Sequence, residues 1–88
     1  MTTALIIVDM QNDFLPGGAL AVAGGDEIID EINRISKAYD LVVATQDWHP
    51  HNHGSFASQH EGARLYEMGV LAGMPQVMWP DHCVQGTP

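Results

Sequence analysis

Residues 4–9 have the sequence Ala-Leu-Ile-Ile-Val-Asp, in which an unbroken apolar run ends abruptly at a carboxylate. The length and branching of this run predict a strand buried on both faces, as in a parallel sheet. Residues 41–45, Leu-Val-Val-Ala-Thr, repeat the pattern and are followed closely by Asp47. Two such runs on either side of a helical segment predict a βαβ unit, whose crossover is almost always right-handed.

The segment between the two predicted strands has the pattern of an amphipathic helix that begins after Gly24 and Gly25. Its first turns are acidic, whereas Arg34 and Lys37 lie toward its end, a distribution that suits the helix dipole. One apolar stripe follows the helical period, and its members are Ile28, Ile29, Ile32, Ile35 and Tyr39. The fold class that follows is α/β, the start of a parallel sheet covered by helices.

From Gln46 onward the sequence has no regular apolar pattern. Residues 46–60 are rich in His, Asn, Gly and Ser and predict a loop. Residues 65–71 predict a short helix, although neighbouring glycines count against it. A two-stranded parallel sheet has open edges and a bare face. We therefore expect this 88-residue chain to assemble with another molecule or to be the N-terminal part of a longer enzyme, and we expect the isolated chain to be poorly folded or to self-associate.

The composition excludes several classes of function. Eleven acidic residues against three cations give a formal net charge of −8, so no basic patch can form for nucleic acid or an anionic membrane surface. No apolar run approaches the roughly 18 residues of a membrane span, and the N-terminus shows no secretion signal. The single cysteine excludes an internal disulfide framework and fits a reducing compartment.

Two carboxylates and a group of histidines are the candidates for chemistry. Sites in parallel sheets form beyond the carboxyl ends of the strands, which is where Asp9 and Asp47 both lie in the predicted unit. Each is either a loop anchor or a base or metal ligand. All five histidines lie between positions 49 and 82, and of these we expect His51 and His60 to be surface residues.

The remaining histidines have spacings that allow a metal site. Asp47 and His49 are two residues apart, so in an extended segment they point the same way. His53 is close enough for the loop to fold back to the same point, and His82 arrives from the far end of the loop region. One carboxylate with two or three imidazoles suits zinc, iron or manganese and leaves positions for water. A polar loop without metal is the alternative interpretation.

Three further side chains have two interpretations each. Cys83 adjoins His82, but neighbouring residues seldom orient as a catalytic pair, so we expect a buried structural thiol. Phe14 and Trp79 are either aromatic residues of the core or its rim, or the walls of a pocket for a planar ligand.

Four blocks of the sequence, taken together, resemble one enzyme family. They are Ala-Leu-Ile-Ile-Val-Asp-Met-Gln-Asn-Asp-Phe at 4–14, Gln-Asp-Trp-His-Pro at 46–50, Asn-His-Gly-Ser-Phe-Ala at 52–57 and Trp-Pro-Asp-His-Cys-Val-Gln-Gly-Thr at 79–87. In this order and spacing they resemble bacterial nicotinamidases, which belong to the isochorismatase-like cysteine hydrolases. The later blocks carry most of the specificity, because the first is shared by the whole superfamily.

The resemblance implies a three-layer α/β/α fold, with residues 1–88 as the N-terminal portion of an isochorismatase-like hydrolase domain. It implies hydrolysis of nicotinamide to nicotinate and ammonia, in pyridine-nucleotide (NAD) salvage in the cytoplasm. In the family a Cys-Asp-Lys triad attacks the amide carbon. The aspartate of the triad maps onto Asp9, which would take the thiol proton and later deliver it to the departing ammonia.

The resemblance also implies a divalent metal, zinc or iron before manganese, that orients the pyridine ring. Its ligands map onto Asp47, His49 and His82, with His53 as a fourth ligand in some members. Phe14 and Trp79 match the aromatic residues that flank the ring.

The sequence departs from the family in its catalytic triad. The family's triad lysine and nucleophilic cysteine come from later strands, whereas Lys37 does not match that lysine and Cys83 matches a non-catalytic cysteine. We therefore expect the chain to be the first part of a nicotinamidase and to be inactive alone. Two rivals stay open: another amidohydrolase of the superfamily, and a non-catalytic metal-binding or interaction fragment.

Overall fold

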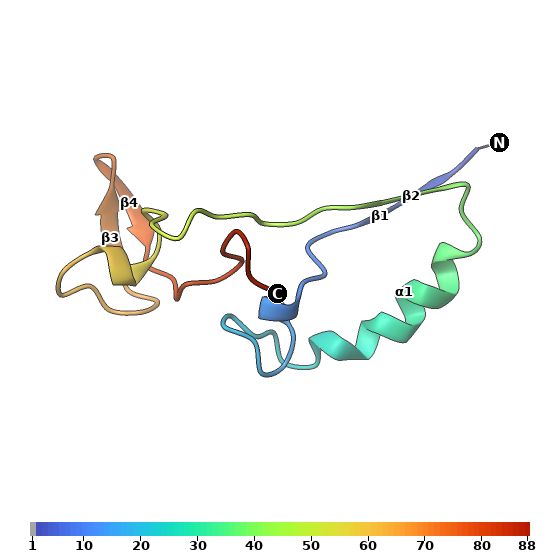
Figure 1. Cartoon of the computed structure of the whole chain (residues 1–88), viewed down its shortest axis with the longest axis horizontal. Helices are drawn as coiled ribbons and strands as arrows, with labels where there is room; N and C mark the ends of the chain where they lie inside the picture. The colour runs from blue at the N-terminus through green and yellow to red at the C-terminus, as the bar shows by residue number, and fades with distance from the viewer. Residues whose placement is uncertain (1) are drawn as a thin grey trace. The chain divides into compact units, whose positions relative to one another are not determined.

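The structure is a computed structural model that describes residues 2–88. It divides into two compact units, the first ending at Asp47 and the second running from Trp48 to Pro88. Each unit contains its own two-stranded sheet (Figure 1). No helix within residues 2–88 is both long and apolar enough to cross a membrane.

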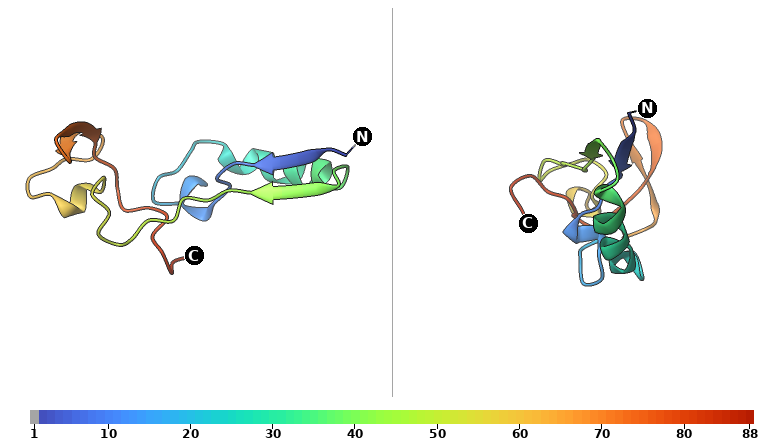
Figure 2. Two further views of the ribbon diagram at one scale, coloured as in Figure 1. Left: turned by 90° about the horizontal axis from the view of Figure 1, so that it is seen from above. Right: turned by 90° about the vertical axis from the view of Figure 1, so that its right-hand side faces the viewer.

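The first unit is the predicted βαβ unit. Strand β1 (Ala4–Ile7) pairs in parallel with β2 (Leu41–Ala44), with Ala4 opposite Leu41. The two strands lie side by side in Figure 2. Between them the chain forms a 3-10 turn, η2 (Gly25–Ile28), that continues into helix α1 (Ile29–Ser36). The α/β prediction and the parallel pairing are therefore confirmed.

The burial predicted for these strands is wrong. Ile6 in β1 is 63% exposed, and its partner Val43 in β2 is 43% exposed. Leu5 and Ile7, which point to the opposite face of β1, are half-buried. An apolar strand has the composition for burial on both faces, but a sheet of two strands with one helix leaves a face uncovered.

A compact loop follows β1 and contains a second 3-10 turn, η1 (Asn12–Phe14). The amide of Leu20 donates to the carbonyl of Asp13 at 2.9 Å, and the amide of Val22 donates to the carbonyl of Phe14 at 2.9 Å. A Cβ atom on Gly18 would collide with the backbone of this turn, so only glycine fits there. The loop thereby fixes the backbone of η1 beyond the end of β1.

The second unit contains a hairpin where a helix was predicted. Strands β3 (Met68–Leu71) and β4 (Met74–Val77) pair antiparallel, so the predicted helix over residues 65–71 is wrong. The two residues that join them, Ala72 and Gly73, have φ angles of 51° and 80°. Two successive residues at positive φ form the turn whose twist matches a two-residue hairpin, and this turn excludes a helix.

The buried side chains of the second unit come mostly from segments without regular structure. Phe56 is 0% exposed and Met78 is 2% exposed. Apart from the short 3-10 turn η3 (Ala57–Gln59), residues 46–60 form the predicted loop. The loop is held by its backbone, because the amide of Trp79 donates to the carbonyl of Ser55 and the amide of Ala57 donates to the carbonyl of Trp79, each at 2.9 Å.

Candidate metal centre

His49 and His82 are brought together by backbone pairing between two loops of the second unit. The amide of His49 donates to the carbonyl of Cys83 at 2.8 Å, and the amide of Gln85 donates to the carbonyl of His49 at 2.8 Å. His49 and Val84 thus form an isolated parallel bridge. This pairing places His82 beside His49, with their ring centroids 5.1 Å apart.

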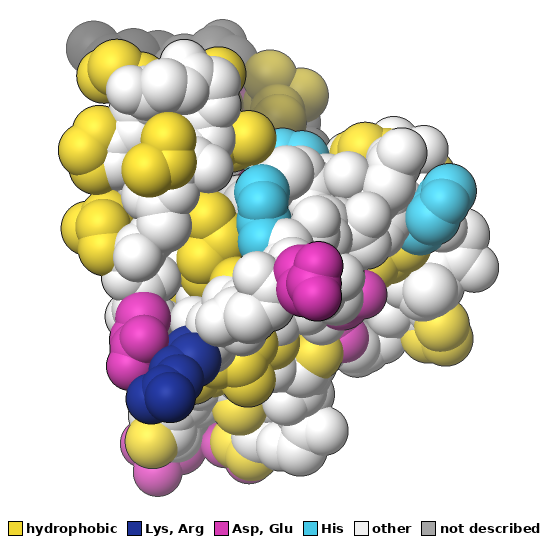
Figure 3. All heavy atoms as spheres, turned by 90° about the vertical axis from the view of Figure 1, so that its left-hand side faces the viewer, with side chains coloured by type: hydrophobic (Ala, Val, Ile, Leu, Met, Phe, Trp, Pro, Cys, Tyr) yellow, Lys and Arg dark blue, Asp and Glu magenta, His cyan; other side chains and the backbone are white. Residues whose placement is uncertain are grey.

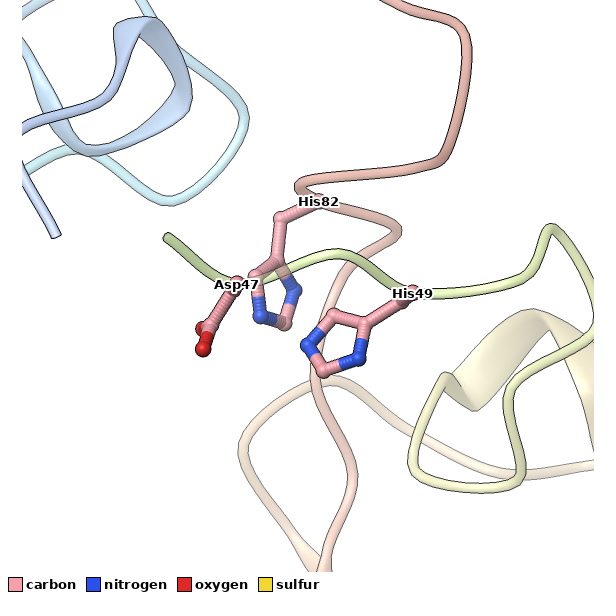
Figure 4. Close-up of side chains that lie close together, drawn as sticks. All are labelled: Asp47, His49 and His82. Carbon is pink, nitrogen blue, oxygen red and sulfur yellow. The ribbon is translucent and has the colours of Figure 1, made fainter. Parts of the chain in front are cut away.

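Asp47 completes a group of three side chains that could hold a metal ion. Asp47, His49 and His82 each offer one ligand atom, and these atoms all lie within 4.8 Å of one another. Figure 4 shows the two imidazole rings and the carboxylate gathered at one point. Asp47 and His49 are half-buried and His82 is buried. One carboxylate and two imidazoles fit a divalent metal with coordination positions left for water.

The hydrogen bond of His82 suits a metal ligand. Its Nδ1 lies 2.7 Å from the carbonyl oxygen of Pro80. A carbonyl oxygen can only accept, so Nδ1 carries the ring proton and the lone pair of the ring is on Nε2. A metal-binding histidine commonly donates its other ring N–H to a carbonyl in this way, which fixes both tautomer and orientation.

The backbone of Asp47 is held by a glutamine of the first unit. The amide of Asp47 donates to Oε1 of Gln11 at 2.8 Å, and Nε2 of Gln11 donates to the carbonyl of Asp47 at 3.0 Å. Sequence reasoning did not single out Gln11. Two signals in the sequence could have found it: its position two residues after Asp9, near the end of β1, and its place in the block at 4–14 that resembles the family.

Asp9 lies just beyond β1, as predicted, and is tied to the segment after β2. The amide of Asp9 donates to Oγ1 of Thr45 at 3.0 Å, and that hydroxyl donates to Oδ1 of Asp9 at 2.8 Å. Asp9 has a φ of 52°, a conformation that costs energy for a residue with a side chain and occurs often at functional sites. The strand ends thus hold a half-buried carboxylate in a fixed position.

The other predicted site residues have separate surroundings. His53 lies outside the three-residue ligand group, although its ring is 4.4 Å from that of His49. Phe14 is half-buried in η1. The ring of Trp79, also half-buried, meets the ring of Tyr66 edge-on at 6.0 Å.

Two predictions about the remaining histidines have different outcomes. His51 is exposed, as predicted. His60 was predicted at the surface, but it is half-buried, and its Nε2 donates to the carbonyl of Gly54 at 2.7 Å. The prediction for His60 is wrong because residues 54–60 fold back on themselves through η3, which gives the imidazole a backbone partner.

Cys83 and Lys37 are the one cysteine and the one lysine of the sequence. Cys83 is 6% exposed, which confirms the prediction of a buried thiol. Lys37 caps the end of α1 and is exposed. Because Leu41 pairs with Ala4, the end of α1 lies near the amino end of β1, whereas Asp9 follows its carboxyl end.

The chain is similar to known proteins over nearly its whole length. The Isochorismatase domain family matches residues 3–75. A nicotinamidase of Acinetobacter baylyi is 60% identical over 84 residues, which are 96% of this chain and 39% of the relative. A solved nicotinamidase and pyrazinamidase of Acinetobacter baumanii has a TM-score of 0.88 and 54% identity, covering 96% of this chain and 41% of that one.

A third similar protein carries a metal. A pyrazinamidase of Pyrococcus horikoshii, solved in complex with zinc, has a TM-score of 0.66 and 46% identity, covering 97% of this chain and 41% of that one. The chain therefore spans only about two fifths of the length of the relatives that it matches.

Proposed function

This chain belongs to the isochorismatase domain family, and we propose on that basis that it is the N-terminal portion of a nicotinamidase domain. The observation that carries the proposal is the ligand group of Asp47, His49 and His82, in a chain 60% identical to a nicotinamidase. The whole enzyme would hydrolyse nicotinamide to nicotinate and ammonia. This reaction serves NAD salvage in the cytoplasm.

Asp9 is the proposed catalytic base. A cysteine thiol adds to the amide carbon of nicotinamide, and Asp9 takes the thiol proton and passes it to the departing ammonia. Water then hydrolyses the thioester to nicotinate. The two hydrogen bonds with Thr45 support this role, because they fix the carboxylate at the end of the sheet.

The metal is proposed to be zinc or iron, with manganese as a weaker candidate. Asp47, His49 and His82 would hold it, and its chemistry is to bind the pyridine nitrogen and so orient the ring. The zinc complex of the pyrazinamidase from Pyrococcus horikoshii supports zinc. Phe14 and Trp79 are the proposed walls that flank the ring.

The nucleophile is proposed to lie outside these 88 residues, because the one cysteine, Cys83, is buried and resembles a non-catalytic cysteine of the family. We therefore expect the purified chain to release no ammonia from nicotinamide. Ammonia release that disappears in Cys83→Ala would show that Cys83 is the nucleophile and that the proposed division of roles is wrong.

A chimera tests the function directly. The chain replaces the matching 39% of the Acinetobacter baylyi nicotinamidase, and ammonia release from nicotinamide is measured. We expect an active chimera, loss of activity in Asp9→Asn, and loss of activity in His49→Ala at limiting zinc. A folded chimera that binds zinc but hydrolyses no nicotinamide would favour the non-catalytic metal-binding interpretation. Activity on other amides alone would favour another amidohydrolase of the family.

A further inference from the structure

Three histidine rings surround one buried aromatic ring in the second unit. The ring centroid of Phe56 lies 5.6 Å from that of His49, 5.5 Å from that of His53 and 5.5 Å from that of His82. Phe56 is 0% exposed, and its ring meets those of His49 and His82 edge-on and that of His53 at a tilt of 56°. Of the three, His53 alone lies outside the ligand group.

The hydrogen bonds of His53 and His82 select opposite tautomers. In His82, Nδ1 donates to the carbonyl oxygen of Pro80 at 2.7 Å, which leaves the ring lone pair on Nε2. In His53, Nδ1 accepts from the backbone amide of Ser55 at 3.2 Å and lies 2.7 Å from the Ser55 hydroxyl. A backbone N–H can only donate, so Nδ1 of His53 carries no proton, and the ring proton lies on Nε2.

Neither nitrogen of His53 therefore offers a lone pair to a metal in this arrangement. Nδ1 is engaged by Ser55, and Nε2 carries the proton. The ring does have another contact, since its centroid is 4.4 Å from that of His49 at an interplanar angle of 39°. His53 thus packs against one face of a proposed ligand while its own orientation is set by the residue two positions later.

On the premise of the metal centre proposed above, we propose that His53 is a positioning residue and not a fourth ligand. Ser55 holds its Nδ1, and its ring limits the rotation of His49, so that the lone pair of His49 stays directed at the metal. Three protein ligands then leave coordination positions for water and substrate, as catalytic metal sites require.

Zinc binding by four variants of the 88-residue chain tests whether His53 contributes through the packing of its ring or through a nitrogen that binds the metal. His53→Phe keeps a flat ring and removes both nitrogens, whereas His53→Ala removes the ring. We expect His53→Phe to bind zinc nearly as well as the unmodified chain and His53→Ala to bind about tenfold more weakly, the low end of what orienting groups contribute. His49→Ala reports on the ligand set. His51→Ala, which removes an exposed histidine of the same loop, is the matched control.

The possible outcomes test the positioning role of His53 and the existence of the metal centre separately. Equal losses in His53→Phe and His53→Ala would overturn the proposal, because a missing nitrogen would then be the cause. Unchanged binding in both would overturn it as well. Unchanged binding in His49→Ala would overturn the metal centre, and the positioning role with it.

A spectroscopic measurement on the unmodified chain tests the proposal without any substitution. Long-range 1H–15N correlation spectra of the imidazole rings identify which nitrogen is protonated. We expect His53 to carry its proton on Nε2 in the metal-free chain and to keep it there when zinc is added, while the nitrogen signals of His49 and His82 move. A zinc-induced shift of a His53 ring nitrogen would overturn the proposal. So would a proton on Nδ1 of His53 in the metal-free chain.

Discussion

The first unit has the regular secondary structure and the second unit has the buried core. Within residues 2–88, every buried side chain lies after Trp48: Ser55, Phe56, Ala57, Met78, His82 and Cys83. The first unit holds a parallel pair and the only α-helix of the described residues, yet its apolar strand residues stay largely exposed. Figure 3 shows hydrophobic side chains, in yellow, on one face of the molecule. Regular hydrogen bonding and a stabilising core are thus separate properties here.

The contrast has a physical origin. A parallel strand pair satisfies its backbone locally, but burying both of its faces takes more covering elements than one short helix. The loops of the second unit satisfy their backbone through bonds between distant segments, such as His49 to Cys83 and Ala57 to Trp79. Phe56 is buried between these segments, and the rings of the proposed ligands His49 and His82 contact its ring edge-on.

The largest expected effect comes from removing Phe56, the most buried side chain of the second unit. Within residues 2–88, Phe56 is the only side chain that is 0% exposed, and substitutions comparable to Phe56→Ala cost about 3–5 kcal/mol. We expect loss of the near-UV circular dichroism signal of the second unit and loss of zinc binding together. Phe14→Ala is the matched control in the first unit, where the ring is half-buried. Equal destabilisation by the two variants would contradict the contrast between the units.

The next effect concerns the ligands. Groups that only orient a metal ligand contribute about 10–100-fold to affinity, so we expect His49→Ala to weaken zinc binding by more than this in calorimetric titration. Acidification should weaken binding as well, because protons compete with the metal for imidazole. His51→Ala is the control, and it is a better one than His60→Ala, since His60 bonds to the backbone. Equal affinities of His49→Ala and the unmodified chain would remove the metal assignment.

A third effect concerns the exposed face of the first unit. Val43 lies in the centre of β2 and is 43% exposed beside Ile6. Exposed, unprotected sheets favour association, so we expect the chain to self-associate and Val43→Glu to shift its sedimentation profile toward monomer. Val70→Glu adds the same charge to β3 of the second unit, where Val70 is 65% exposed, and should shift it less. A monomeric unmodified chain would contradict the prediction.

The sequence predicted the two units unequally well. The strands and helix of the first unit could be predicted from the spacing of their apolar residues, because local contacts favour the same elements. Their burial could not, because apolar composition does not say whether a covering element is present. The β3–β4 hairpin was missed because Ala72-Gly73 is a weaker turn signal than Asn-Gly.

The candidate site shows the same limit. Spacing and family resemblance suggested the ligand group, but the role of His53 depends on which of its nitrogens faces the Ser55 amide. The orientation of the His53 ring depends on the conformation of the loop, which the identities of the residues do not indicate. The fixed orientation of His82 likewise depends on its bond to the carbonyl of Pro80.

The smallest expected effect concerns the hydrogen bonds that hold the backbone of Asp47, the last residue of the first unit. Gln11→Ala removes two part-buried hydrogen bonds to the Asp47 backbone. At about 1 kcal/mol net each, the two bonds contribute about 2 kcal/mol; we assign about half of this to the orientation of Asp47 for the metal and expect zinc affinity to fall about fivefold, since 1.4 kcal/mol is about tenfold. Gln85→Ala is the matched control, because that glutamine donates to the carbonyl of Trp48 through an exposed bond of 3.4 Å. If both variants bind zinc equally well, the two bonds from Gln11 do not contribute to the orientation of Asp47. A loss in Gln11→Ala alone means that the regular unit, although it lacks buried side chains, holds the carboxylate ligand in place.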